Sequence, residues 1–164
     1  MSLIALGCDP GAKWTVDSDG KIAGDDPTVA VAAGTLAYSP NGGLYVCIQA
    51  DGAVGQYQAC QIYGNWQAAA ITTTNGTEAV KICIPQVALA NNEYGWGLVW
   101  GNGQLEVGAN CAANAQLYTT GNGGRLDDGA TAIHISGAQL TAARGGGNGP
   151  ALVAVQWPAV DLVV

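Results

Sequence analysis

Short apolar segments recur along the chain, and residues that favour turns separate them. The segment from Leu44 to Ala50, LYVCIQA, begins after SPNGG and ends at Asp51-Gly52, and both flanks are typical of turns. Comparable segments are QYQACQIY, WQAAAITTT, EAVKICIPQVAL, YGWGLVWG, QLEVG, AQLYTT, AIHISG, AQLTAA and ALVAVQW. No long window keeps its apolar positions at helical spacing, and glycine interrupts almost every stretch. The pattern predicts an all-β protein, built as a compact β-barrel or β-sandwich.

The segment YGWGLVWGNGQLEVG carries the clearest local pattern. Asn102-Gly103 lies between two apolar runs, where a tight β-hairpin would place its turn. Strand alternation puts the large side chains before this turn on one face: Tyr94, Trp96, Leu98 and Trp100. We expect this aromatic face to be buried core. The opposite face is mostly glycine, which predicts the close approach of another backbone or a strong bend.

The first 43 residues differ from the rest in composition. The stretch between Asp9 and Asp26 holds five of the nine aspartates, together with other turn formers. We therefore predict an N-terminal arm or short hairpin over residues 1–43 and a β-barrel or β-sandwich core domain over residues 44–164. The part up to about Thr28 has few apolar residues, so we expect it to contribute more to attachment than to folding.

Charge is scarce in this chain of 164 residues. Charged residues make up 10% of it, against about 25% in an ordinary soluble domain, so we expect a neutral surface or one that partners cover. The formal net charge of −7 argues against a nucleic-acid partner, because phosphate contacts need clustered basic residues. The basic residues are scattered: Lys13, Lys21, Lys81, Arg125 and Arg144.

Cysteine usage and hydropathy indicate the compartment in which the chain folds. Five cysteines are an odd number without a CxxC pair, so neither a disulfide framework nor a zinc site is predicted. We expect buried free thiols, formed in a reducing cytosol, at Cys8, Cys47, Cys60, Cys83 and Cys111. No stretch reaches the roughly 18 apolar residues of a membrane helix, and no basic region precedes the short apolar run at the N-terminus. These features predict a soluble chain with no membrane partner and no cleaved export signal.

Candidate catalytic groups are few. The single histidine, His134, lies in AIHIS, where alternation sends the two isoleucines to one face and His134 to the other, at the surface. No GxSxG nucleophile elbow occurs, and one histidine cannot make an HExxH zinc motif. The pairs Asp25-Asp26 and Asp127-Asp128 could supply an acid and a base, but neighbouring residues on a strand point to opposite sides. We interpret both pairs as turn formers, and Arg125 is available to balance Asp127-Asp128.

Asp17-Ser18-Asp19-Gly20 resembles a fragment of a calcium-binding loop. With Gly20 at the sixth position, Thr15 falls at the first ligand position and Asp26 at the last, where a bidentate Glu is usual. A plain β-turn fits this partial match better than a bound cation, because no helix is predicted on either side. Glycine clusters such as GNGG and GGGNG lack the Lys and Ser/Thr of a phosphate loop. We therefore predict no catalytic, cofactor-binding or metal-binding residue, no cofactor and no enzyme activity.

Three segments in the second half resemble a known family: YGWGLVWG (Tyr94 to Gly101), CAANAQLYTTGNGGRLDD (Cys111 to Asp128) and ISGAQLTAARGGGNGPALVAVQWP (Ile135 to Pro158). In this order they are similar to the head decoration, or cement, proteins of tailed double-stranded DNA phages. The resemblance covers about residues 78–164, and the aspartate-rich N-terminus has no matching motif. It implies a structural protein on the outer surface of a phage capsid, assembled in the host bacterial cytoplasm, which clamps neighbouring major capsid protein subunits. No functional residue carries over, because the family implies a shape and a binding partner.

Other interpretations stay open. A tail or baseplate accessory protein would share these features. A carbohydrate-binding β-sandwich would stack exposed Trp and Tyr on sugar rings. Strand position argues against it by placing Trp96, Trp100 and Trp157 in the core, which leaves only Trp14 and Trp66 to face solvent. An enzyme of unknown type is the weakest hypothesis.

Strand edges bear on the oligomeric state. Alanine- and glycine-rich segments such as WQAAAITTT and ALVAVQW carry few charges to guard their edges, and unguarded edges are usually covered by another element or another chain. We expect a homotrimer seated where three capsid subunits meet, since a threefold site repeats each contact three times. A monomer whose edges close inside its own barrel is the competing expectation.

Overall fold

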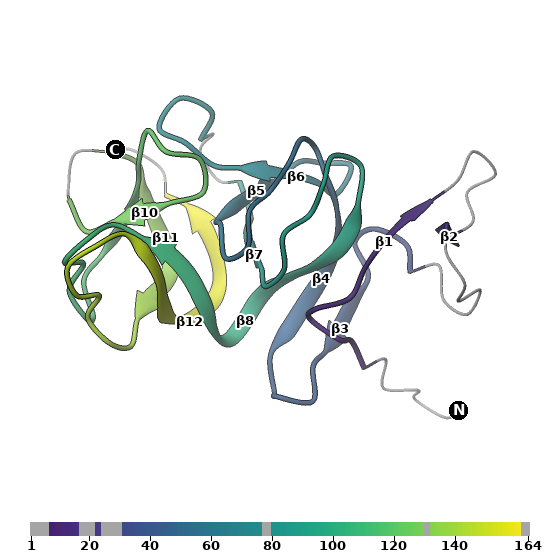
Figure 1. Cartoon of the computed structure of the whole chain (residues 1–164), viewed down its shortest axis with the longest axis horizontal. Coiled ribbons are helices and arrows are strands. Elements are labelled where there is room, and N and C mark those ends of the chain that lie inside the picture. The colour runs from purple at the N-terminus through teal and green to yellow at the C-terminus, as the bar shows by residue number, and fades with distance from the viewer. Residues whose placement is uncertain (1–6, 17–21, 24–30, 77–79, 130–131, 162–164) are drawn as a thin grey trace.

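The described part of the chain contains twelve β-strands and no helix, which confirms the predicted all-β class (Figure 1). The structure is a computed structural model that describes residues 7–16, 22–23, 31–76, 80–129 and 132–161. The strands are β1 (Lys13–Val16), β2 (Ile22–Ala23), β3 (Leu36–Tyr38), β4 (Leu44–Ala50), β5 (Cys60–Ile62), β6 (Gln67–Ala70), β7 (Ile82–Pro85), β8 (Tyr94–Val107), β9 (Leu117–Thr119), β10 (Leu126–Asp127), β11 (His134–Leu140) and β12 (Gly149–Val160).

Five of these strands close into a β-barrel, which we call the first barrel. Its ring of pairings runs β4–β8–β7–β5–β6 and returns to β4, and only the pairing of β4 with β6 is parallel. Strands of this ring contribute one cluster of buried side chains, among them Val46, Ile48, Cys60, Cys83 and Val99. Closure removes the free edges that an open sheet of such apolar strands would expose.

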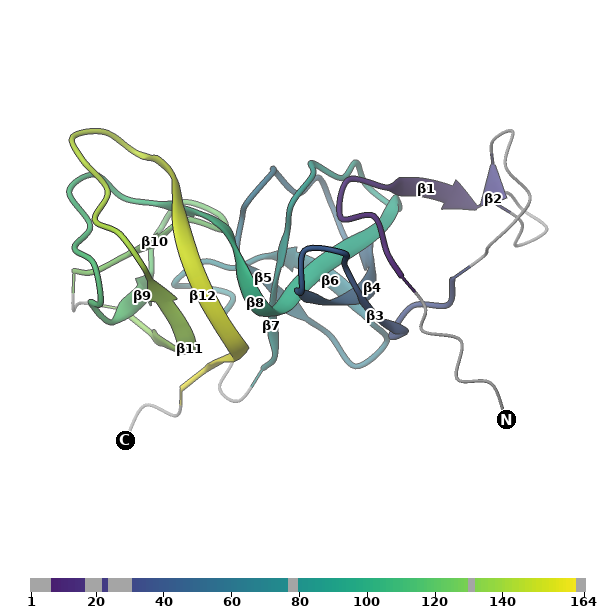
Figure 2. The same cartoon turned by 90° about the horizontal axis from the view of Figure 1, so that it is seen from below.

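β8 continues beyond the first barrel into a second ring of pairings, which we call the second barrel (Figures 1 and 2). Residues 100–107 of β8 pair with β12, β12 with β11, β11 with β9 and β9 with β10. β10 returns to β8 through the parallel pair of Leu126 and Val107. Strands of this ring bury a further set of side chains: Leu105, Val107, Leu117, Leu126, Ile135, Leu140, Val153 and Val155. One strand is therefore shared by two barrels.

The hairpin turn predicted at Asn102-Gly103 is wrong. Both residues lie within β8 and pair with Ala154 and Val153 of β12. The irregular backbone is at Gly101 instead, whose φ is +102° and where a Cβ would lie 3.0 Å from the Cα of Gly43. The dipeptide suits a tight turn, but β12 offers backbone partners along this whole stretch, and these favour an extended strand.

The glycine face of β8 is turned towards core side chains of the first barrel. A Cβ at Gly97 would lie 2.6 Å from the Sγ of Cys83, and a Cβ at Gly95 would lie 2.6 Å from the Cδ2 of Leu89. At these two positions the predicted close approach is to core side chains and not to another backbone. The missing side chains on β8 leave room for larger ones from neighbouring segments.

Replacing Gly97 by alanine is expected to lower the free energy of unfolding by about 1–3 kcal/mol, because the added methyl overlaps the buried Cys83 side chain. Gly64→Ala is the matched control, since nothing lies within 4 Å of a Cβ built there. Urea unfolding measures both variants. Equal midpoints for Gly97→Ala, Gly64→Ala and the parent protein would contradict this packing.

The buried aromatic face predicted for β8 is confirmed at Trp96 and wrong at Trp100. Trp96 is 4% exposed and makes an edge-to-face contact with Trp14, with 6.0 Å between ring centroids. Trp100 is exposed. The pairing of β4 with β8 shifts register between Leu44 and Tyr45, and this irregularity interrupts the alternation that groups Trp100 with Trp96.

The N-terminal strands pack onto the barrels from outside. β1 pairs with the start of β8 and with β2, while β3 pairs with β4. β1 and β2 lie at the end of the molecule away from β9–β12 (Figures 1 and 2). Cys8 is buried and Trp14 packs on Trp96, so these two residues contribute to folding. The division into residues 1–43 and 44–164 stays a prediction, as does a role of the arm in attachment.

Candidate functional site

Four large apolar side chains lie exposed around one end of the first barrel. We call them the apolar rim: Leu36 (47% exposed), Tyr38 (62%), Trp100 (44%) and Trp157 (48%). Leu36 and Tyr38 share a face of β3. Tyr38 pairs with Leu44, and Leu44 pairs with Trp100. Trp100 pairs with Gln156, the residue before Trp157, so the backbones that carry Tyr38, Trp100 and Trp157 lie on neighbouring strands.

An apolar cavity of about 390 Å³ opens beside Leu36 and Trp157, and we call it the mouth. Val46, Ile62 and Val99 line it and belong to the buried cluster of the first barrel, so the cavity leads towards that core. The other lining residues are Gly34, Trp66, Lys81, Ile82 and Pro158. Among all these residues Lys81 alone carries charge. Apolar cavities at the ends of β-barrels are frequent binding sites.

An irregular stretch of backbone presents Trp157 to solvent. The pairing of β11 with β12 shifts register between Ser136 and Ala138, and Gly137 between them has a φ of +70°. Trp157 has a φ of +51°, a conformation that costs a bulky residue on the order of 1–3 kcal/mol. The prediction of a core Trp157 is therefore wrong, because the bulge redirects the side chain. The glycine inside the ISGAQL strand is the sequence signal for such a bulge.

Trp14 and Trp66, which the sequence assigns to the solvent side, are half-buried instead. Trp14 stacks on Tyr94 with 6.3 Å between ring centroids. The Trp66 ring fills the space beside Gly34, where a Cβ would lie 2.5 Å from the ring. The Nζ of Lys81 lies 5.6 Å from the centroid of Trp66, within the range of a cation–π contact. Apolar and π contacts thus keep both indoles against the protein.

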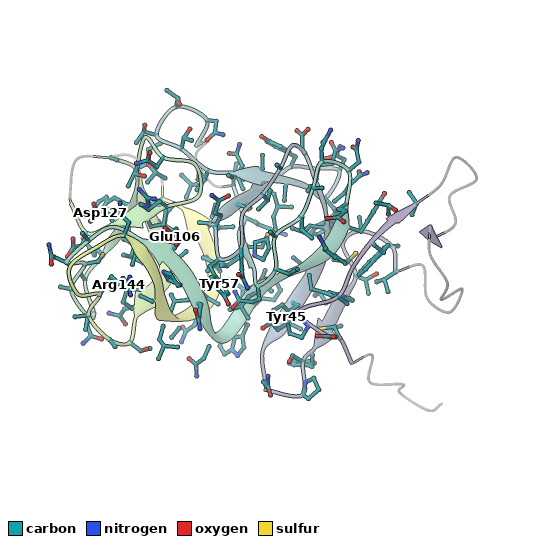
Figure 3. All side chains as sticks on the ribbon, viewed as in Figure 1. Tyr45, Tyr57, Glu106, Asp127 and Arg144 are labelled. Carbon is teal, nitrogen blue, oxygen red and sulfur yellow. The ribbon has the colours of Figure 1, made fainter. Side chains whose placement is uncertain are left out.

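The other basic side chains of the described residues also have partners within the chain. Lys13 pairs with Glu93 at 3.2 Å, and Arg125 pairs with Glu106 at 3.5 Å. Arg144 donates hydrogen bonds to backbone carbonyls of its own loop. Figure 3 shows Glu106 and Arg144 on the second barrel. Arg125 thus pairs with Glu106 and not with Asp127-Asp128, as the sequence had suggested. The basic side chains of the described residues are dispersed over the molecule.

His134 lies at the start of β11 and is half-buried at the surface. Its Nδ1 is 2.5 Å from the Oδ2 of Asp161, and this hydrogen bond is the main reason why the pKa of Asp161 lies below its ordinary value. The Oγ of Ser136 donates to the Ala159 carbonyl at 3.3 Å. Among the described residues, His134 thus has an acid partner but no hydroxyl aligned to it as a catalytic triad requires.

Cys111, Asp127 and Asp128 each bring one ligand atom within 4.8 Å of the others. Asp127 accepts a hydrogen bond from the amide of Asp128 at 2.8 Å, as predicted for a turn former, whereas Asp128 accepts one from the amide of Ala112 at 2.8 Å. The bond from Ala112 is the main cause that lowers the pKa of Asp128. Burial, followed by the charge of Asp128, raises the pKa of Cys111 to about 11. With no metal ion at the cluster, the thiol therefore stays protonated near neutral pH.

All five cysteines are free and buried, which confirms the prediction. Burial raises the pKa of Cys8 to about 11 and that of Cys47 to about 12. Burial also raises the pKa of Cys60 and Cys83, which pair across β5 and β7. Such thiols are unreactive near neutral pH. The remaining sequence candidates, Asp17-Ser18-Asp19-Gly20 and Asp25-Asp26, lie outside the described residues.

Comparison with known proteins gives no match, either among protein-family models or among curated proteins. Within the part of the chain that the structure describes, no helix is long and apolar enough to cross a membrane. The apolar rim and the mouth are therefore the features of the described residues that indicate a function.

Proposed function

We propose that this protein is a head decoration protein, which binds the outside of a tailed-phage capsid and clamps neighbouring major capsid protein subunits. The observation that carries the proposal is the apolar rim beside the open mouth of the first barrel. Contiguous exposed apolar side chains on a soluble domain mark contact surfaces. Three of the four rim residues are Trp or Tyr, which are enriched among the side chains that dominate interface energies.

The backbone at Trp157 supports a binding role. A bulky residue at positive φ is less stable than a glycine or asparagine there, yet this chain keeps an exposed tryptophan at φ +51°. Strain of this kind is typical of functional positions. A partner that covers the indole would gain apolar contact at a place where folding gains little.

The double barrel suits a clamp. β8 runs through both barrels as one strand of 14 residues, so the rim and the far end of the second barrel hold their spacing. A rigid surface loses less conformational entropy on binding than a flexible one. Low charge also fits a surface that other subunits cover, because fewer charged groups must give up water.

We propose further that the protein binds as a homotrimer where three capsid subunits meet. Three linked copies repeat one moderate contact, and the combined attachment is then much stronger than any single contact. The partner is the major capsid protein and the final location is the outer surface of the virion. Assembly in the bacterial cytoplasm agrees with five free thiols.

Binding to capsids tests this proposal. Purified protein mixed with empty expanded capsids that lack it should co-sediment with them, and an electron cryo-microscopy map should show three copies around each occupied threefold site. Light scattering on the free protein should give three times the chain mass. Failure to bind capsids would refute the decoration role, and binding to tails would favour the accessory role. A monomer in solution that also stands alone on the shell would refute the trimer.

A carbohydrate-binding role is the second candidate. Exposed Trp100 and Trp157 support it, as does a cavity of about 320 Å³ on the second barrel whose lining includes the amides of Asn114, Gln116 and Gln139. Indole rings can stack on sugar rings, and amides can bond to hydroxyl groups. Hits on a glycan array, without capsid binding, would favour this role over decoration.

A further inference from the structure

The cavity of about 320 Å³ on the second barrel, which we call the groove, forms where the pairing of β11 is interrupted (Figure 1). Ile135 pairs with Leu117 of β9, and the Leu140 carbonyl accepts a hydrogen bond from the Asn114 amide at 3.0 Å. Between these two links β11 has more residues than the segment that faces it, so the two cannot pair regularly. Both segments line the groove, which is large enough for a small ligand.

Most of the described residues that line the groove offer uncharged hydrogen-bonding groups. These are the amides, hydroxyl and imidazole of Asn114, Gln116, His134, Ser136, Gln139 and Gln156. The other lining residues are alanines, one isoleucine and one glycine, which provide apolar surface between the polar groups. None of the described lining residues is Asp, Glu, Lys or Arg. The ligand that suits such a lining is uncharged and combines several hydroxyl groups with apolar C–H surface.

Contacts within the protein hold two of these polar groups in place. The Nδ1 of His134 is 2.5 Å from the Oδ2 of Asp161, and the hydroxyl of Tyr118 donates to the Oε1 of Gln116 at 2.8 Å. The rings of Tyr118 and His134 also lie against each other, with 5.3 Å between centroids. These contacts leave the Nε2 of His134 and the Nε2 of Gln116 to bond a ligand. Groups that are positioned before binding lose less conformational entropy when a ligand arrives.

We propose that the groove binds an uncharged hexopyranose unit of a carbohydrate. The sugar hydroxyls bond the side-chain amides and the Nε2 of His134, and the C–H groups of the ring pack on the alanine and isoleucine side chains. The proposal rests on the carbohydrate-binding candidate, for which it names the site and the ligand class, and not on the decoration role. The groove and the mouth have no described lining residue in common.

Ligand-observed NMR and titration calorimetry test the ligand class with the methyl glycosides of glucose, galactose and mannose. At least one of them should bind with a dissociation constant on the order of 1 mM, the range for a ligand of this size. The matching uronic acid and amino sugar should bind at least about 10-fold more weakly, because a charged group would lose water without gaining a partner of opposite charge. Absence of binding by all three neutral glycosides, or equal binding by the charged sugars, would overturn the proposal.

Two asparagines provide a matched pair of variants that tests the place of binding. Asn114 lines the groove and Asn110 is not among its described lining residues, yet both are exposed and have nearly the same φ, +60° and +62°. Glycine adopts this φ without strain, so each substitution removes an amide side chain and keeps the backbone. Asn114→Gly should weaken sugar binding about 3- to 10-fold, as expected for a lost hydrogen bond, and Asn110→Gly should leave it unchanged. Circular dichroism checks that both variants are folded.

The outcomes separate this proposal from the two roles considered above. Sugar binding with the same affinity in Asn114→Gly, Asn110→Gly and the parent protein would refute the groove as the site and would leave a carbohydrate-binding role on another surface. Capsid binding without any sugar binding would refute this proposal and keep the decoration role. Sugar binding that Asn114→Gly weakens, in a protein that does not bind capsids, would support the groove and refute decoration.

Discussion

Replacing Trp96 by alanine is expected to lower the free energy of unfolding by about 3–5 kcal/mol, the range for truncation of a buried large aromatic side chain. Trp96 is buried on β8 opposite Cys47 of β4. It also contacts Trp14, which packs β1 against β8. The truncation therefore removes core contacts and also weakens the packing of β1 against β8. Chemical denaturation followed by circular dichroism measures the change.

Trp100→Ala is the control on the same strand. Its side chain is exposed, so the substitution should cost about 1 kcal/mol or less. Near-parental stability in Trp96→Ala would mean that the aromatic face of β8 is turned outward. That result would also strengthen the sugar-stacking hypothesis.

Replacing Trp157 by asparagine is expected to weaken capsid binding by about 30- to 1000-fold, which corresponds to roughly 2–4 kcal/mol for a central interface residue. The variant should be at least as stable as the parent protein, because the indole is half exposed and asparagine tolerates the positive φ at this position. Co-sedimentation at a series of protein concentrations measures the affinity, and thermal unfolding measures the stability.

Leu152→Asn is the control for this second experiment. Leu152 is 56% exposed on β12 but lies outside the apolar rim. It should bind capsids as the parent protein does. If Trp157→Asn also binds like the parent protein, the rim is not the contact surface, and the proposal in this form fails.

Local patterns in the sequence predict strands well where an apolar run has clear flanks. The segment from Leu44 to Ala50 is β4, with the predicted bounds. The turn at Asn102-Gly103 fails because dipeptide chemistry carries no information about β12, a partner that comes much later in the chain. Local patterns do not predict the closure of the two rings either, because closure depends on pairing between segments that are distant in the sequence. The second barrel closes through a single parallel pair, Leu126 with Val107.

The apolar rim could be predicted only in part. Its tryptophans are evident as residues, but alternation assigns a face only while the pleat is regular. Register shifts on β4 and on β11 interrupt it beside Trp100 and Trp157, and both side chains emerge at the surface. Trp14 and Trp66 are covered by segments distant in sequence, such as the partners Tyr94 and Gly34. These contacts depend on which segments come together in the folded structure, and the sequence alone does not show this.

Sharing β8 between the two barrels also determines how the molecule carries mechanical load. A pull between partners that grip opposite barrels runs along one continuous strand and not through a linker. The backbone hydrogen bonds of β8 to β4 and to β12 lie across that direction. They are loaded in shear and share the force, whereas bonds at the end of a hairpin would open one after another. Neither barrel can separate from the other without losing β8, so the two barrels resist tension as one unit.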